Sequence, residues 1–176
     1  VQKMFEGAKV LRMDADTTSG KGGHEKALAR FEALESGILL GTQMVAKGLD
    51  YPEVTLVGVI NADTTLHMPD FRSAERTYQL LSQVAGRAGR GEKPGTVVIQ
   101  TYWPDHPAIQ AASTHDREPF YTQELADRRA LNYPPFGRLA RVLVTGESLQ
   151  AVREQSAAIA HAIKHVCPPD VVVLGP

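Results

Sequence analysis

Apolar residues along the chain fall into two patterns that together predict a sheet covered by helices. Short, nearly continuous apolar runs are typical of strands buried on both faces, and they occur at residues 9–14, 38–40, 54–60 and 96–101. Elsewhere apolar residues recur every three or four positions, as in amphipathic helices; such helices are expected at 24–36, 72–85, 108–112, 118–131 and 149–166. Alternating strands and helices predict the α/β class with a parallel sheet.

The last third of the chain shows a different arrangement. Predicted strands at 138–145 and 171–174 flank the helix at 149–166, an order that is half of a small split βαβ domain. A change in composition at Trp103-Pro104-Asp105-His106-Pro107 separates this part from the first strands. We therefore expect a lobe at 1–103, a helical connector at 104–136 and the start of a C-terminal α+β domain at 137–176.

Composition narrows the function classes. The 176 residues carry a net charge of −1, so any nucleic-acid contact must come from local basic patches and not from a global field. One cysteine, Cys167, excludes a disulfide framework and a thiolate metal cluster, and the six histidines lack ligand spacing, so no metal site is expected. No signal peptide or membrane-length apolar run is visible, which favours the cytoplasm.

A row of polar residues closes the helix expected at 72–85. Gln83, Arg87 and Arg90 are spaced i, i+4 and i+7, which places them within roughly 40° of one another if the helix continues. They lie opposite the apolar stripe, and Gly86 and Gly89 leave room for a phosphate or another backbone to come close. Two such guanidiniums are suited to clamp a phosphate. The plain alternative is a helix end, with glycine as its stop and arginines at its negative pole.

Polar residues also follow two of the predicted strands. Gly41-Thr42-Gln43 comes after the run at 38–40, and Asn61-Ala62-Asp63 comes after the run at 54–60. In open α/β sheets ligands bind beyond the carboxyl ends of the strands. We therefore expect these residues and the arginine row to meet at that edge.

Two segments carry a resemblance to a known family. Gln83-x-x-Gly86-Arg87-x-Gly89-Arg90 resembles motif VI of superfamily 2 helicases, and the run from Gly41 to Asp50 resembles their motif V. The resemblance is closer than the superfamily and covers almost the whole chain. Together with the segments at 14–18, 70–76, 100–102 and 133–136, the ordered set resembles the PriA (primosomal protein N′) family of replication-restart helicases.

The resemblance implies an incomplete second RecA-like lobe of an ATP-dependent 3′-to-5′ DNA helicase, followed by part of a C-terminal domain. The family restarts stalled forks, initiates primosome assembly, and contacts single-stranded DNA-binding protein and other primosome proteins. ATP with Mg²⁺ would serve the full-length protein, because the first lobe and its P-loop lie outside this chain. The zinc-binding cysteines of the family are also absent here. The fragment alone is therefore expected to be inactive and without zinc.

Roles carry over by position in the two motifs. Arg90 would be the arginine finger, with Arg87 beside it and Gln83 as a polar contact to phosphate or water. Asp50 and Gly48 would join the two arginines in nucleotide binding. Thr42, Gln43 and Lys47 would contact the DNA backbone. Plainer alternatives stay open: Lys47 as a solvated lysine and Asp50 as a turn former. For three other basic residues a solvated face is the favoured interpretation over a DNA-facing one: Arg72, Arg76 and Arg138.

A second hypothesis is a non-catalytic α/β module for protein or DNA interaction, in which the arginine row docks on an acidic partner surface. The order of motif V before motif VI favours the motor. A sheet strand that precedes this segment in the family is missing from the chain, so we expect an open sheet edge through which the fragment self-associates.

Overall fold

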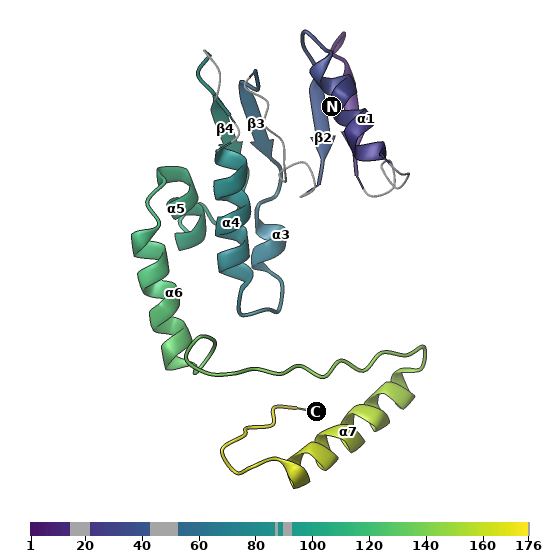
Figure 1. Ribbon diagram of the computed structural model, residues 1–176, viewed down its shortest axis with the longest axis vertical. Coiled ribbons are helices and arrows are strands. Elements are labelled where there is room, and N and C mark those ends of the chain that lie inside the picture. Colours follow the sequence, from purple (N-terminus) through teal and green to yellow (C-terminus); the bar gives the residue numbers. More distant parts are fainter. Residues whose placement is uncertain (15–21, 43–52, 87, 90–92, 176) are drawn as a thin grey trace. The chain divides into compact units, whose positions relative to one another are not determined.

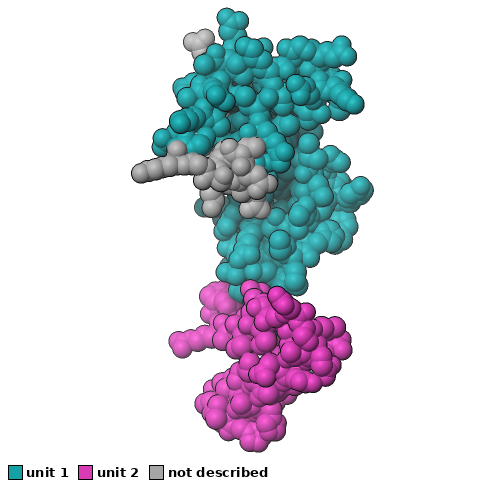
Figure 2. Space-filling view, turned by 90° about the vertical axis from the view of Figure 1, so that its right-hand side faces the viewer, with its two compact units in different colours: residues 1–131 teal, residues 132–176 magenta. Residues whose placement is uncertain are grey.

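The computed structural model describes residues 1–14, 22–42, 53–86, 88–89 and 93–175. The chain divides into two compact units, residues 1–131 and residues 132–176, which are coloured separately in Figure 2. Each unit is described by itself.

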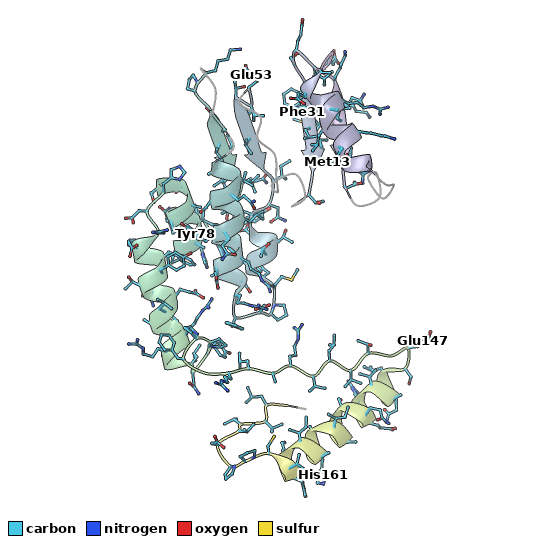
Figure 3. All side chains as sticks on the ribbon, viewed as in Figure 1. Met13, Phe31, Glu53, Tyr78, Glu147 and His161 are labelled. Atoms are coloured by element: carbon cyan, nitrogen blue, oxygen red, sulfur yellow. The ribbon has the colours of Figure 1, made fainter. Side chains whose placement is uncertain are left out.

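The first strands form a parallel pair. β1 (Val10–Met13) pairs with β2 (Ile38–Gly41), with Val10 opposite Ile38 and Met13 opposite Gly41. The connection between them contains α1 (Gly23–Glu32), which packs against β1 (Figure 1). Met13 is fully buried and Phe31 of α1 is half-buried; both are labelled in Figure 3. The predicted strand–helix–strand order is therefore confirmed for this part of the chain.

The next two strands form a second parallel pair. β3 (Leu56–Val59) pairs with β4 (Thr96–Ile99) in a register that places Val59 opposite Ile99. The crossover contains α3 (Asp63–Leu66) and α4 (Ser73–Ala85) (Figure 1). The apolar runs predicted burial on both faces of the sheet, and this is wrong for the described residues: Val59 and Ile99 face the core, while Leu56 and Val98 remain 63% and 55% exposed. Strand side chains alternate between faces, and the described helices cover one face.

Helix α4 lies at the centre of the core of the first unit. Its predicted apolar stripe is confirmed, since Thr77 and Leu81 are each 1% exposed. Leu81 packs in one cluster with Ala62, Ile109 and Ala112. Burial of such a stripe, rather than the intrinsic propensity of α4, is what stabilises a helix of this length.

Two further helices pack beside α4. α5 (Pro107–Thr114) and α6 (Glu118–Ala130) bury Ala108, Ala111 and Phe120 in a second cluster. Tyr78 of α4, labelled in Figure 3, joins this cluster with its ring centroid 5.1 Å from that of Phe120. The predicted connector at 104–136 therefore belongs, as far as Leu131, to the same compact unit as the strands.

The second unit contains α7 (Leu149–Val166), whose bounds match the prediction. Ser148 caps it, because the Ser148 side chain accepts a hydrogen bond of 3.3 Å from the backbone N–H of Ala151. The strands predicted at 138–145 and 171–174 are wrong for this structure, in which both segments lie outside any strand. An extended segment becomes a strand only when a neighbour completes its hydrogen-bond ladder, and the described residues of this unit supply none. None of the helices described here combines the length and apolarity that crossing a bilayer requires.

The close contact between the backbones of Gly89 and Gly95 leads to a prediction on stability. A Cβ added at Gly95 would lie 2.1 Å from the backbone nitrogen of Gly89. We predict that Gly95→Ala lowers the free energy of unfolding by about 1–3 kcal/mol, because the neighbouring backbone must move. The measurement is urea unfolding followed by circular dichroism.

Gly58→Ala in β3 is the matched control. A Cβ at Gly58 meets no atom within 4 Å, so its effect should stay within about 0.5 kcal/mol. Equal unfolding midpoints for the two variants would show that the close approach of Gly89 and Gly95 carries no energetic weight.

Candidate nucleotide and nucleic-acid interface

Helix α4 ends earlier than the predicted arginine row requires. Its last residue is Ala85, and the Gly86 N–H closes the final turn on the carbonyl oxygen of Ser82 at 3.1 Å. Gly89 then adopts φ 73°, a left-handed conformation that glycine adopts at little cost and that ends helical geometry. The condition for the row, a helix that continues past Gly86, is therefore not met, and Arg87 and Arg90 themselves lie outside the described residues. Glycine acts here as a helix stop, which was the plainer of the two interpretations.

The segment after α4 is anchored at the start of the second sheet. The Gly89 N–H donates to the carbonyl oxygen of Val54 at 3.1 Å, and Val54 lies two residues before the start of β3. The backbones of Gly89 and Gly95 come so close that neither position has room for a Cβ. The sequence predicted that Gly86 and Gly89 leave room for another backbone to come close, and this is confirmed at Gly89.

This anchor lies at the opposite end of the strands from the one predicted. Gly89 neighbours the residues that lead into β3 and β4, whereas the arginine row was expected at their carboxyl ends. The reason is geometric, because a crossover helix between parallel strands runs back toward the start of the sheet. The described residue Gly89 thus lies away from the predicted edge, while Arg87 and Arg90 lie outside the described residues and their place at that edge stays a prediction.

Most of the predicted site residues lie outside the described residues. They are Arg87 and Arg90 of the arginine row, Gly48 and Asp50 of the nucleotide set, and Gln43 and Lys47 of the DNA set. Two are described: Gln83 is exposed in the last turn of α4, and Thr42 is exposed directly after β2. The exposure of both side chains is compatible with contacts to a ligand.

The carboxyl ends of β3 and β4 are joined by a buried aspartate. Asp63, at 3% exposure, accepts hydrogen bonds from the Thr101 hydroxyl at 2.5 Å and from the Tyr102 backbone N–H at 2.9 Å. The hydrogen bond from Thr101, followed by that from Tyr102, holds the pKa of Asp63 below its usual value, because both donors favour the charged carboxylate. The sequence predicted Asp63 among the polar residues at the ligand edge of the sheet. In the structure, its carboxylate holds together the segments that follow β3 and β4.

An aromatic group extends from this junction. Tyr102 and Trp103 lie three and four residues beyond the end of β4 and are 85% and 51% exposed. The Trp103 ring lies 4.9 Å from the His67 ring and is nearly parallel to the His106 ring at 6.3 Å. In the sequence, Tyr102 belongs to a segment that carries the family resemblance and Trp103 marks a boundary, and neither residue was predicted to bind a ligand. The available signal was a pair of large aromatic residues at the carboxyl end of a predicted strand.

The basic residues at the start of α4 are held by one carboxylate. Asp70 forms ion pairs with Arg72 at 3.1 Å and with Arg76 at 3.0 Å. The hydrogen bond from the Arg72 guanidinium is the first cause that lowers the pKa of Asp70 to about 2. Each arginine side chain still exposes nearly half of its surface, so both lie on a solvated face.

A second arginine cluster joins α4 to α6. Arg128 lies 2.7 Å from Glu75 and 2.8 Å from Glu124, and its side chain is only 12% exposed. Its guanidinium carbon lies 5.1 Å from the centroid of the Phe71 ring, within cation–π range. The Arg128 guanidinium is thus paired with two carboxylates and packed over one ring, and these contacts fix the first turn of α4 against the last turn of α6.

Comparison with known proteins defines the class of this chain. The model of the helicase conserved C-terminal domain matches residues 1–92, and the model of the primosomal protein N C-terminal domain matches residues 129–176. The first match covers more than half of the chain, so the chain belongs to the helicase conserved C-terminal domain family, and its α/β lobe is RecA-like.

Similarity over the whole chain then specifies the branch. Replication restart protein PriA of Bacillus subtilis is 58% identical over 174 residues, which are 99% of this chain and 22% of that relative. The proteins of the same name from Synechocystis and Treponema pallidum are 48% and 44% identical, over 98% and 100% of the chain and 21% and 27% of their own lengths. The predicted resemblance to the PriA family is confirmed. The chain spans only about a quarter or less of the length of these relatives.

The Arg128 cluster yields a prediction on stability. Replacing Arg128 by methionine keeps the aliphatic bulk but leaves the Glu75 and Glu124 carboxylates facing one another in a partly buried site. We expect a loss of about 1–3 kcal/mol in the free energy of unfolding. Arg129→Met, which changes the neighbouring exposed side chain, is the matched control and should cost much less. Equal losses for both variants in urea unfolding would contradict the assignment.

His106 yields a prediction on pH. Its Nδ1 accepts the Ala108 N–H at 3.2 Å at the start of α5, and burial lowers its pKa from the ordinary value of 6.5, against the opposing effects of Glu124 and Asp63. Unfolded His106 therefore binds protons more readily than folded His106. The contribution of neutral His106 to the free energy of unfolding is therefore complete above about pH 6.5, and it is lost as the pH falls through the lowered pKa of the folded state.

The test compares the chain with its His106→Asn variant, which still caps the helix but does not titrate. Urea unfolding midpoints at closely spaced pH values should fall less steeply below pH 6.5 in the variant. An identical pH profile for both proteins would remove His106 from this role.

Proposed function

We propose that the chain is the second motor lobe and the adjoining C-terminal segment of an ATP-dependent DNA helicase that restarts stalled replication forks. The observation that carries this proposal is the helicase-domain match over residues 1–92 together with whole-chain similarity to replication restart proteins. We retain the division into a lobe at 1–103, a helical connector at 104–136 and the start of a C-terminal domain at 137–176. Helices α5 and α6 of the connector pack onto the lobe.

The arginines of motif VI would act on the nucleotide. Negative charge is redistributed on the γ-phosphoryl group during hydrolysis, and a guanidinium placed there stabilises the transition state. Arg90 takes this role, Arg87 supports it at the phosphate or at the lobe interface, and Gln83 contacts phosphate or the attacking water. The hydrogen bond from the Gly89 N–H to the Val54 carbonyl oxygen supports the proposal, because it fixes the backbone within the motif VI segment.

Nucleotide binding would need the other lobe as well. ATP with Mg²⁺ supplies the phosphoryl group and its charge neutralisation, and Gly48 and Asp50 would contact the nucleotide from this lobe. The P-loop expected in the first lobe lies outside the 176 residues, so this chain alone is expected to be inactive. Zinc binding would likewise belong to the longer protein.

DNA would be held through its backbone. Thr42, Gln43 and Lys47 would contact the phosphates of one strand, and such contacts position a strand without reading its sequence. Opening and closing of the cleft between the lobes would then move the strand in the 3′-to-5′ direction. The exposed position of Thr42 at the end of β2 supports this role.

The proposed partners follow from the same assignment. They are forked and single-stranded DNA, single-stranded DNA-binding protein and the other primosome proteins, in the cytoplasm. Self-association of the fragment through a sheet edge stays a prediction. The alternative, a non-catalytic module whose arginine row docks on an acidic partner, has less support, because the helicase domain match covers residues 1–92 and the whole chain is similar to replication restart proteins.

The decisive variant is Arg90→Ala in the full-length protein. We expect nucleotide binding to stay close to that of the parent, while DNA-stimulated ATP hydrolysis falls about 10³- to 10⁵-fold, as for other arginine fingers. Arg153→Ala on the exposed surface of α7 is the control and should retain full turnover. Parent-level ATPase in Arg90→Ala would remove this residue from catalysis, and a parent without DNA-stimulated ATPase would overturn the proposed function.

A further inference from the structure

The aromatic residues beyond the end of β4 have no role in the nucleotide and DNA contacts proposed above. Tyr102 exposes 85% of its surface and Trp103 exposes 51%. Both line a shallow hollow of about 280 Å³, together with Pro104, Asp105 and His106. We call this surface the aromatic platform. Aromatic side chains of this size are usually covered in a folded protein, since each buries a large apolar area.

The backbone beneath the platform is fixed by hydrogen bonds. Asp63 accepts from the Thr101 hydroxyl and from the Tyr102 N–H, and the Trp103 N–H donates to the Thr101 hydroxyl oxygen at 3.0 Å. The His106 N–H closes the following turn on the Trp103 carbonyl oxygen, also at 3.0 Å. A rigid backbone lowers the entropic cost of presenting the two rings to a ligand.

Neighbouring rings hold Trp103 in place. His67 packs against one part of the indole, with 4.9 Å between ring centroids, and His67 is itself tied to α3 by a 2.8 Å hydrogen bond between its Nδ1 and the Asp63 carbonyl oxygen. His106 lies almost parallel to the indole, at an interplanar angle of 7°. Trp103 thus has a defined orientation, while Tyr102 projects beside it.

Size and charge restrict the class of ligand. A hollow of about 280 Å³ lies below the roughly 300–1,000 Å³ of pockets that enclose a whole small molecule. Its lining includes no lysine or arginine, and its one formal charge is the carboxylate of Asp105. A phosphate would be repelled there. A flat, neutral ring that stacks on an aromatic face fits these constraints.

The position of the platform agrees with this ligand. It begins three residues after the end of β4 and is hydrogen-bonded to Asp63, which lies beyond the end of β3, so it marks the carboxyl edge of this parallel pair. Ligands of α/β sheets bind beyond that edge. The proposed DNA contact at Thr42 also follows the carboxyl end of its own strand, β2. Phosphate contacts and a base contact at the same kind of edge are what a protein needs to hold a single strand.

We propose that Tyr102 and Trp103 form a stacking site for an unpaired base of the DNA strand on which the motor acts. The inference rests on the proposed function, because it takes single-stranded DNA as the ligand. Stacking tolerates any base, since every base has a π face. The site therefore adds grip on the strand without adding sequence specificity.

The experiment uses the full-length protein and two labelled single strands of equal length, one with bases and one with abasic sites throughout its central part. Binding is followed by fluorescence anisotropy. Tyr102→Ala should weaken binding of the base-bearing strand about 5- to 100-fold, as expected from the loss of one base–aromatic stack. It should leave binding of the abasic strand unchanged. Tyr102→Phe keeps the ring and should bind like the parent.

Two controls separate stacking from general damage. Phe5→Ala removes another exposed aromatic ring of the first unit, one that is 52% exposed, and should change neither affinity. Trp103 is the only tryptophan of the 176 residues. In the full-length protein, the difference in emission between the parent and its Trp103→Phe variant reports the platform, and this difference should shrink with the base-bearing strand but not with the abasic one.

The possible outcomes decide between the occupants. If Tyr102→Ala binds both strands like the parent and Trp103 emission does not respond to DNA, the stacking site is wrong, while DNA-stimulated ATPase still supports the proposed function. An equal loss of affinity for both strands would also overturn base stacking. Quenching of Trp103 by a protein partner in the absence of DNA would assign the platform to a protein. A parent that shows neither single-strand binding nor DNA-stimulated ATPase overturns both proposals.

Discussion

The buried carboxylate of Asp63 is the interaction on which the carboxyl edge of the second strand pair depends. It lies where α3 begins, beyond the end of β3, and it accepts hydrogen bonds from Thr101 and Tyr102, the second and third residues after β4. A buried charge is tolerated only when it is fully hydrogen-bonded. Asp63 meets that requirement by joining two strand ends that are distant in sequence. The turn that carries the aromatic platform exists in this form because of that bond.

Helix α4 links this edge to the opposite one. Its buried stripe of Thr77 and Leu81 fixes it on the sheet, and its two ends are fixed by different means. At its start, Asp70 and the Arg128 cluster supply charged contacts; past its end, the segment is held at Gly89 by a backbone hydrogen bond and by the absence of side chains at two glycines. The motif VI segment thus begins from a rigid element.

The sequence predicted the fold better than it predicted the site. Periodicity located α4 and α7 with their observed bounds to within a residue, because each buries a regular apolar stripe. It failed for the strands expected at 138–145 and 171–174, since a strand depends on a pairing partner that local pattern does not reveal. The arginine row depended on a continuation of α4 past Gly86, and the helix instead ends at Ala85, before this glycine.

The structural role of Asp63 could not be predicted from its local sequence either. Its partners Thr101 and Tyr102 lie 38 and 39 residues further along the chain, and no periodic signal connects positions so far apart. The exposure of Tyr102 and Trp103 likewise depends on how α3 and α5 pack around them. Motif spacing pointed to the helicase class because catalytic chemistry demands specific residues, whereas a supporting carboxylate can stand at many positions.

Arg128 gives the molecule a mechanical property. Its contact with Glu75 joins the last turns of α6 to the first turn of α4, and the 13 residues of α4 form a stiff rod about 20 Å long at 1.5 Å per residue. Because a helix resists compression far more than a loop does, this contact sets the end of α6 against a stiff element that runs as far as Ala85.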